Sequence, residues 1–298
     1  MASSSPSKQS DDGVSFECET TYRDHFQLRG VHWRCTESLH RGVILIVHGS
    51  GEHCRRYEHV ARFFNERGFA VASFDMRGHG HSDGERGHVP SLNAIFDDIE
   101  SMIQRVRVEY AAPLPLIIYA HGTGSLFCLG HIVRRRSRLF DCQAMILSSP
   151  SICLGRRPSQ ILFRLARVFA HLRPQMALPV RGNYLNVYTN DPVAVDAYRA
   201  DPLVHDRWTA AILAVFLELG IMMEKNNIET PWPLLVQHGE EDGSAPISRV
   251  RRWNRRRVRG NNATFKEWPK HMHELHNDLE KEEVLLYAAE WICANLHI

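Results

Sequence analysis

A short apolar strand runs directly into a turn of small residues and then into an apolar helix. Leu116–Tyr119 has the composition of a buried strand, Ala120–Gly124 supplies the turn, and an apolar helix begins near Leu126. Because the strand and helix are joined so tightly, this unit is typical of a parallel sheet covered by helices. The central residue of the turn, Gly122, would then lie at the edge of the sheet.

Strands and helices alternate on both sides of this unit. Apolar runs predict further strands at 15–22, 31–35, 43–47, 70–74, 144–147, 233–237 and 263–268. Helical spacing is clearest over 92–106, with Ser91 as the predicted N-cap. Alternation of this kind implies right-handed crossovers, so we predict an α/β fold with a mostly parallel, doubly wound sheet.

The alternation stops near Pro150 and resumes at about residue 231. Residues 151–230 read as helical, without a clear strand. We therefore predict a core formed by residues 14–150 and 231–298, with a helical cap at 151–230. Residues 1–13 are polar and contain no apolar signal region, which predicts a disordered N-terminal tail.

Composition excludes several classes of protein. A net charge of +2 makes no case for a nucleic-acid partner. No apolar run reaches the roughly 18 to 20 residues that span a bilayer. The seven cysteines are scattered and form no C-x-x-C pair, which favours reduced thiols and a cytoplasmic location.

Two loops offer the acid and base of a hydrolytic site. Asp242 follows the predicted strand at 233–237, although Glu240 and Glu241 are neighbouring alternatives. His273 follows the strand that ends at Trp268, which suits a general base. The three histidines within 271–276 also suit a metal, but no H-E-x-x-H spacing is present, so we predict neither a metal nor a cofactor.

Hydrolysis of an ester also needs N–H donors for the oxyanion that develops on the carbonyl oxygen. The loop that follows the strand at 43–47 can supply the N–H of Ser50. The second donor would be the N–H of Thr123, immediately after the centre of the turn. Both are backbone groups, so neither depends on the side chain at position 122.

Five motifs in order resemble the monoacylglycerol lipase and lysophospholipase group of α/β-hydrolases. They are His48–His53, Asp75–Gly84, Asp201–Leu203, His238–Asp242 and His273–Asn277. The resemblance implies an eight-stranded sheet with a helical cap, and a glycerol monoester or lysophospholipid as substrate. It assigns the catalytic acid to Asp242 and the base to His273.

The central motif departs from that family. Members read G-H-S-x-G-G, whereas this chain reads Ala-His-Gly-Thr-Gly-Ser over 120–125, which leaves Gly122 at the position of the nucleophile. We expect a catalytically impaired, lipid-binding relative. The alternative is an active carboxylic-ester hydrolase, with Gly122 an engineered knock-out or with water attack assisted by His273. Ser125 lies nearly one helical turn beyond the elbow and is poorly placed to substitute.

The cap and two arginine-rich segments suggest a surface that contacts lipid. Residues 161–172 are amphipathic and 209–223 almost wholly apolar, while arginines are dense at 249–259 and 134–138. Cap packing and solvated helix faces explain these features without a membrane. Peripheral contact with anionic headgroups is the alternative, and no aromatic platform accompanies the charge to suggest nucleic acid.

Overall fold

The computed structural model describes residues 13–19, 26–35, 40–135, 141–152, 168–178 and 188–298. The predicted tail lies outside these ranges except for its last residue, Gly13, which is already the first residue of a strand. Most of the predicted amphipathic segment 161–172 and of the arginine cluster 134–138 also lies outside the described residues.

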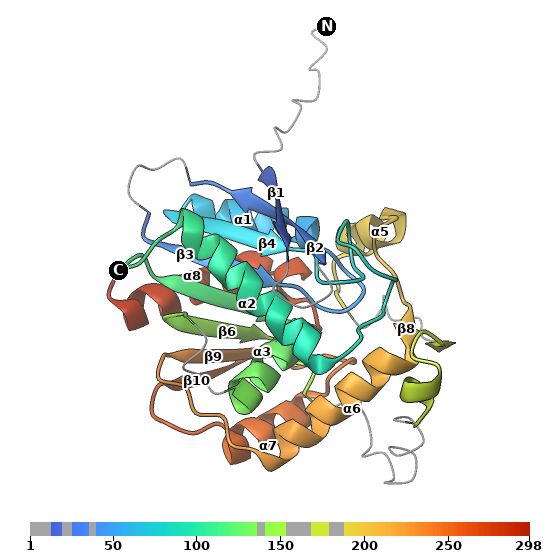
Figure 1. The fold of residues 1–298 in the computed structure, drawn as a ribbon. Coiled ribbons are helices and arrows are strands. Elements are labelled where there is room, and N and C mark those ends of the chain that lie inside the picture. Colours follow the sequence, from blue (N-terminus) through green and yellow to red (C-terminus); the bar gives the residue numbers. More distant parts are fainter. Residues whose placement is uncertain (1–12, 20–25, 36–39, 136–140, 153–167, 179–187) are drawn as a thin grey trace, which may run out of the picture.

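One eight-stranded sheet forms the centre of the molecule (Figure 1). In spatial order its strands are β1 (Gly13–Glu19), β2 (Gln27–Trp33), β4 (Phe69–Phe74), β3 (Gly42–Val47), β5 (Leu116–His121), β6 (Ala144–Ser148), β9 (Leu234–Gly239) and β10 (Ala263–Trp268). β2 pairs antiparallel with β1 and β4, and all other pairs are parallel. The prediction of an α/β fold with a mostly parallel sheet is confirmed.

Helices connect the strands. They are η1 (Cys54–Tyr57), α1 (Glu58–Asn65), α2 (Leu92–Glu109), α3 (Gly122–Arg135), α5 (Pro192–Ala200), α6 (Ala210–Lys225), α7 (Ile247–Arg257), η4 (Leu275–Asn277) and α8 (Lys281–Leu296). The predicted N-cap of α2 is confirmed, because Ser91 Oγ accepts the N–H of Ala94 at 3.2 Å.

The strands bury side chains on both faces, as a parallel sheet requires. Ile44 and Ile46 pack on the face covered by α1 and α8. Their neighbours Val43, Leu45 and Val47 pack on the opposite face, against residues of α2, α3 and α7. Helix α6 adds buried side chains to the same core and contacts α3 and α7 (Figure 1).

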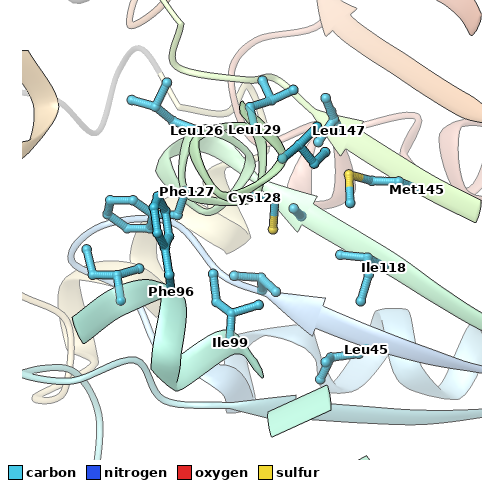
Figure 2. Packing of buried hydrophobic residues seen from close by; sticks show 14 of the residues in the cluster. Leu45, Phe96, Ile99, Ile118, Leu126, Phe127, Cys128, Leu129, Met145 and Leu147 are labelled. Atoms are coloured by element: carbon cyan, nitrogen blue, oxygen red, sulfur yellow. The ribbon is translucent and has the colours of Figure 1, made fainter. Parts of the chain in front are cut away.

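Helix α3 is held in the larger of these two cores (Figure 2). Phe127 lies beside Phe96 of α2, while Cys128 lies over the strands that carry Ile118 and Met145. All five of these side chains are almost fully buried. Dense packing of this kind leaves the first turn of α3, and therefore Gly122, little freedom to shift.

The region predicted as a helical cap also contains strands. Besides α5 and α6 it holds a two-stranded antiparallel sheet of β7 (Ala177–Leu178) and β8 (Trp208–Thr209), which the prediction did not include. Strands of two residues are too short to show alternating hydrophobicity, which is why the sequence does not reveal them. Among the described residues, no helix combines the length and apolar character needed to cross a bilayer.

Candidate active site

The turn between β5 and α3 contains no connecting residue, since the strand ends at His121 and the helix begins at Gly122. Gly122 has φ +53°, in the left-handed region that residues with a Cβ avoid. Two residues later, a Cβ on Gly124 would lie 2.5 Å from the carbonyl oxygens of both Val47 and His48. The start of α3 is therefore pressed against the end of β3 and needs a glycine there.

Asp242 and His273 lie together at the carboxyl ends of two adjacent parallel strands, β9 and β10. Their side chains are buried, and His273 Nδ1 lies 2.7 Å from Asp242 Oδ2. The other carboxylate oxygen accepts the N–H groups of Ser244 and Ala245, each at 2.8 Å. This arrangement places the ring proton of His273 on Nδ1, so that Nε2 presents a lone pair.

The two side chains stabilise each other's charge. Burial acts to raise the pKa of Asp242, but the nearby His273 and hydrogen bonds from His238 and His273 outweigh it, and the pKa lies well below its usual range. Burial acts to lower the pKa of His273, but the Asp242 carboxylate outweighs it, and the pKa is raised. An ionised carboxylate thus supports a more basic imidazole, which is the acid–base unit that hydrolysis requires.

The candidate alternatives for these two positions do not meet at the site. Glu240 and Glu241 are exposed, whereas Asp242 is buried against His273. His271 Nδ1 lies 2.8 Å from a backbone oxygen, that of Pro269. Within the described ranges, no group of three or more histidine, cysteine, aspartate or glutamate side chains could hold a metal ion.

An open position faces the imidazole at Gly122. A Cβ added to Gly122 would lie 3.2 Å from His273 Nε2, 3.7 Å from Ser151 Oγ and 3.8 Å from Gly49 Cα. Ser151 was not a predicted site residue. The sheet topology could have identified it, because Ser151 follows β6, the parallel neighbour of β5. The carboxyl ends of neighbouring parallel strands meet at one edge of the sheet.

Two backbone amides are available beside this position. Ser50 follows β3, and Thr123 occupies the first turn of α3, where N–H groups have no partner inside the helix. Across the described part of the chain, neither N–H donates a hydrogen bond to protein. The predicted pair of donors is therefore free to receive a negatively charged oxygen.

A buried carboxylate holds the loop that carries Ser50. Glu52 Oε1 accepts the N–H of Gly49 at 2.6 Å and the hydroxyl of Tyr57 at 3.1 Å. Burial and the nearby Glu274 raise the pKa of Glu52 to about 7. Sequence reasoning missed Glu52, because a carboxylate in a loop ordinarily indicates an exposed side chain.

The Ser125 hydroxyl points away from the open position. Its Oγ is fully buried and donates to the carbonyl oxygen of Ala120 at 2.7 Å. This bond ties the first turn of α3 back to β5. Ser125 therefore stabilises the turn and cannot supply the missing nucleophile from this geometry.

A narrow apolar pocket begins beside Ser50 and runs between α2, α3 and α6. Its walls include Phe127 of α3 and Ile212 and Phe216 of α6. The cavity is small in this conformation, about 10 Å³, and its lining is largely apolar, as the walls of an acyl-binding pocket are. A paired guanidinium and carboxylate, Arg77 and Asp98, form part of its lining.

Comparison with known proteins places the chain in a family. The family model described as serine aminopeptidase, S33, matches residues 38–280. The chain is 32% identical over 257 residues to a monoacylglycerol lipase of Mycolicibacterium smegmatis, an alignment that covers 86% of this chain and 89% of the relative. It is 25% identical over 246 residues to phospholipase YtpA of Bacillus subtilis, covering 81% and 91% of the two chains.

Solved structures show the same fold. A soluble variant of monoglyceride lipase from Saccharomyces cerevisiae, in complex with a substrate analogue, superposes with a TM-score of 0.82 at 18% identity, covering 98% of this chain and 99% of that one. Monoacylglycerol lipase of Paleococcus ferrophilus gives 0.75 at 24% identity, covering 95% and 99%. The chain belongs to the serine aminopeptidase S33 family of α/β-hydrolases and is monoacylglycerol lipase-like.

Proposed function

We propose that this protein binds a glycerol monoester or lysophospholipid and is impaired in hydrolysing it. The observation that carries this proposal is the glycine at position 122, whose missing Cβ would lie 3.2 Å from His273 Nε2. An acid, a base and two amide donors surround a place where residue 122 supplies no attacking oxygen. In serine hydrolases, loss of the nucleophile reduces kcat about a million-fold, while the remaining groups keep roughly a thousand-fold acceleration over water.

The proposed ligand rests on the pocket and on the relatives. The pocket is lined largely by apolar side chains, which is the chemistry that contacts an acyl chain, and Ser50, a proposed oxyanion donor, forms part of its lining. The relatives named above include a monoacylglycerol lipase and a phospholipase. Both act on acyl chains joined to glycerol, which is the chemistry that this pocket and these amides would recognise.

Titration with a 1-O-alkylglycerol ether, which cannot be hydrolysed, tests binding separately from turnover. We expect saturable binding by the native chain and release of fatty acid from monoacylglycerol close to background. Ile212→Trp fills the pocket and should weaken binding, whereas Val193→Trp, at a position of α5 that is 73% exposed, should not. Rapid hydrolysis by the native chain, abolished in His273→Ala, would contradict the impairment.

A second function is favoured by the free lone pair on His273 Nε2. In the described residues no protein group bonds this nitrogen, and Asp242 raises the pKa of the ring. A water at the open position could give its proton to Nε2 while its oxygen attacks the ester carbon. Such an enzyme would release alcohol and acid together without an initial burst, and both products would disappear in His273→Ala.

We also propose peripheral contact with a membrane. The arginines on α7 include Arg252, Arg255 and Arg256, which are exposed, and each basic residue near an anionic surface adds about 1 kcal/mol of attraction. The cap exposes the large apolar side chains Val168, Phe169, Leu172 and Met176. Sedimentation with vesicles should show binding that rises with phosphatidylserine content and falls in the triple arginine-to-glutamine variant; equal binding by both proteins would refute it.

A further inference from the structure

The segment after β6 is fixed beside the elbow at two points. The N–H of Ser149 donates to the carbonyl oxygen of Gln237 at 2.8 Å, and the N–H of Ser151 donates to that of Gly122 at 3.1 Å. Ser149 itself has φ 45°, a left-handed conformation that is uncommon for a residue other than glycine. A backbone held in such a conformation points to a function for what the segment positions.

That segment brings the hydroxyl of Ser151 to the open position. Ser151 is only 7% exposed, and its Oγ lies 3.7 Å from the point that a Cβ of Gly122 would occupy. His273 Nε2 lies 3.2 Å from the same point. Neither atom has a hydrogen-bond partner among the described residues, so both groups face the space left by Gly122 unpaired.

We propose that Ser151 acts as a substitute nucleophile and forms a covalent acyl adduct with an ester. This goes beyond the proposed binding function, which requires no covalent step. A serine side chain has three staggered χ1 positions, so its oxygen can move within the open space while the backbone stays bonded to Gly122. Ser125, in the first turn of α3, is engaged with Ala120.

The reaction balances with groups that the site already holds. Ser151 Oγ gives its proton to His273 Nε2 and bonds to the ester carbon, and the carbonyl electrons move to an oxyanion that accepts the N–H groups of Ser50 and Thr123. Collapse of this intermediate breaks the bond to the glycerol oxygen, which takes the proton from His273. Water then hydrolyses the Ser151 ester by the same steps and releases the fatty acid.

A fluorophosphonate probe tests this directly, because it phosphonylates a serine only where a base and an oxyanion site activate the hydroxyl. The full-length protein would be labelled, weighed intact and mapped by peptide mass spectrometry. We expect one adduct per chain at Ser151, and at least a tenfold lower rate of labelling in Ser151→Ala and in His273→Ala. Gly122→Ser is the positive control and should carry the label at residue 122.

Each other outcome overturns the proposal. A native chain that stays unlabelled while Gly122→Ser is labelled would show that Ser151 is not activated, and a label on Thr123 would assign the role elsewhere. If neither protein is labelled, the base and amides are not competent and Ser151 cannot react through them. Binding of the alkylglycerol ether by Ser151→Ala, with a native circular dichroism spectrum, separates failure of this proposal from failure of lipid binding.

Discussion

Replacing Asp242 with asparagine should reverse the direction in which the environment shifts the pKa of His273. Asparagine keeps the size of the side chain, and its oxygen can still accept the N–H groups of Ser244 and Ala245. It removes the charge that lies 2.7 Å from His273 Nδ1. Burial, which lowers the pKa of His273, is then unopposed by that carboxylate, so the pKa should fall from above its ordinary value to below it.

The same change should lower stability by about 1.5–3 kcal/mol, the contribution of a hydrogen bond to a charged group. The depressed pKa of Asp242 stabilises the fold above its unfolded pKa of about 3.9, and this contribution is lost as the pH falls through the folded value. The raised pKa of His273 stabilises it below about 6.5, and this contribution is lost as the pH rises through the folded value. The loss of stability should therefore be greatest between about pH 4 and 6.5.

Histidine-selective NMR titration measures the pKa, and urea unfolding across the pH range measures the stability. Glu241→Gln is the matched control, because it removes a carboxylate from the same loop at an exposed position. An unchanged pKa of His273 in Asp242→Asn would refute the reasoning that the carboxylate controls this imidazole. So would an equal change in Glu241→Gln.

Three further predictions concern the surroundings of the site. Gly124→Ala should destabilise the protein by about 1–3 kcal/mol in thermal unfolding. The control is Gly220→Ala on α6, whose added methyl group meets nothing within 4 Å and should be neutral or stabilising. Equal effects of the two changes would contradict the close approach of α3 to β3. Phe216→Ala should widen the pocket and improve binding of longer alkylglycerols while lowering the melting temperature, and an unchanged chain-length preference would exclude this pocket as the acyl site. Because the pKa of Glu52 is raised in the fold, the native protein should lose stability as the pH rises from about 4.5 to 7. Glu52→Gln should abolish this pH-dependent loss, and an unchanged pH profile of stability would refute the prediction.

The sequence predicts the sheet because strands such as Val43–Val47 are continuous apolar runs. Such runs can be recognised without knowing which strands lie beside them. It also places Asp242 and His273, since each follows a predicted strand and parallel strands end at one edge of the sheet. The small sheet of β7 and β8 could not be predicted, because two-residue strands are defined by their partners.

Ser151 and Glu52 show a different limit of sequence reasoning. Ser151 gains its place from a hydrogen bond across the fold, in which its backbone N–H donates to the carbonyl oxygen of Gly122. Glu52 gains its role within its own loop, where its side chain accepts the N–H of Gly49. A serine after one strand becomes notable only when the neighbouring strand is followed directly by a residue without a side chain. Such pairings depend on the register between β5 and β6, which the sequence does not specify.

Turnover of monoacylglycerol by Gly122→Ser and Gly122→Ala decides whether residue 122 is a vacant nucleophile position. Both variants add a Cβ at φ +53°, with a similar loss of stability of about 1 kcal/mol, and only one adds a hydroxyl. We predict that serine raises kcat by at least about a thousand-fold and that alanine does not. Equal turnover by the two variants, with both folded and binding the alkylglycerol ether, would contradict the account.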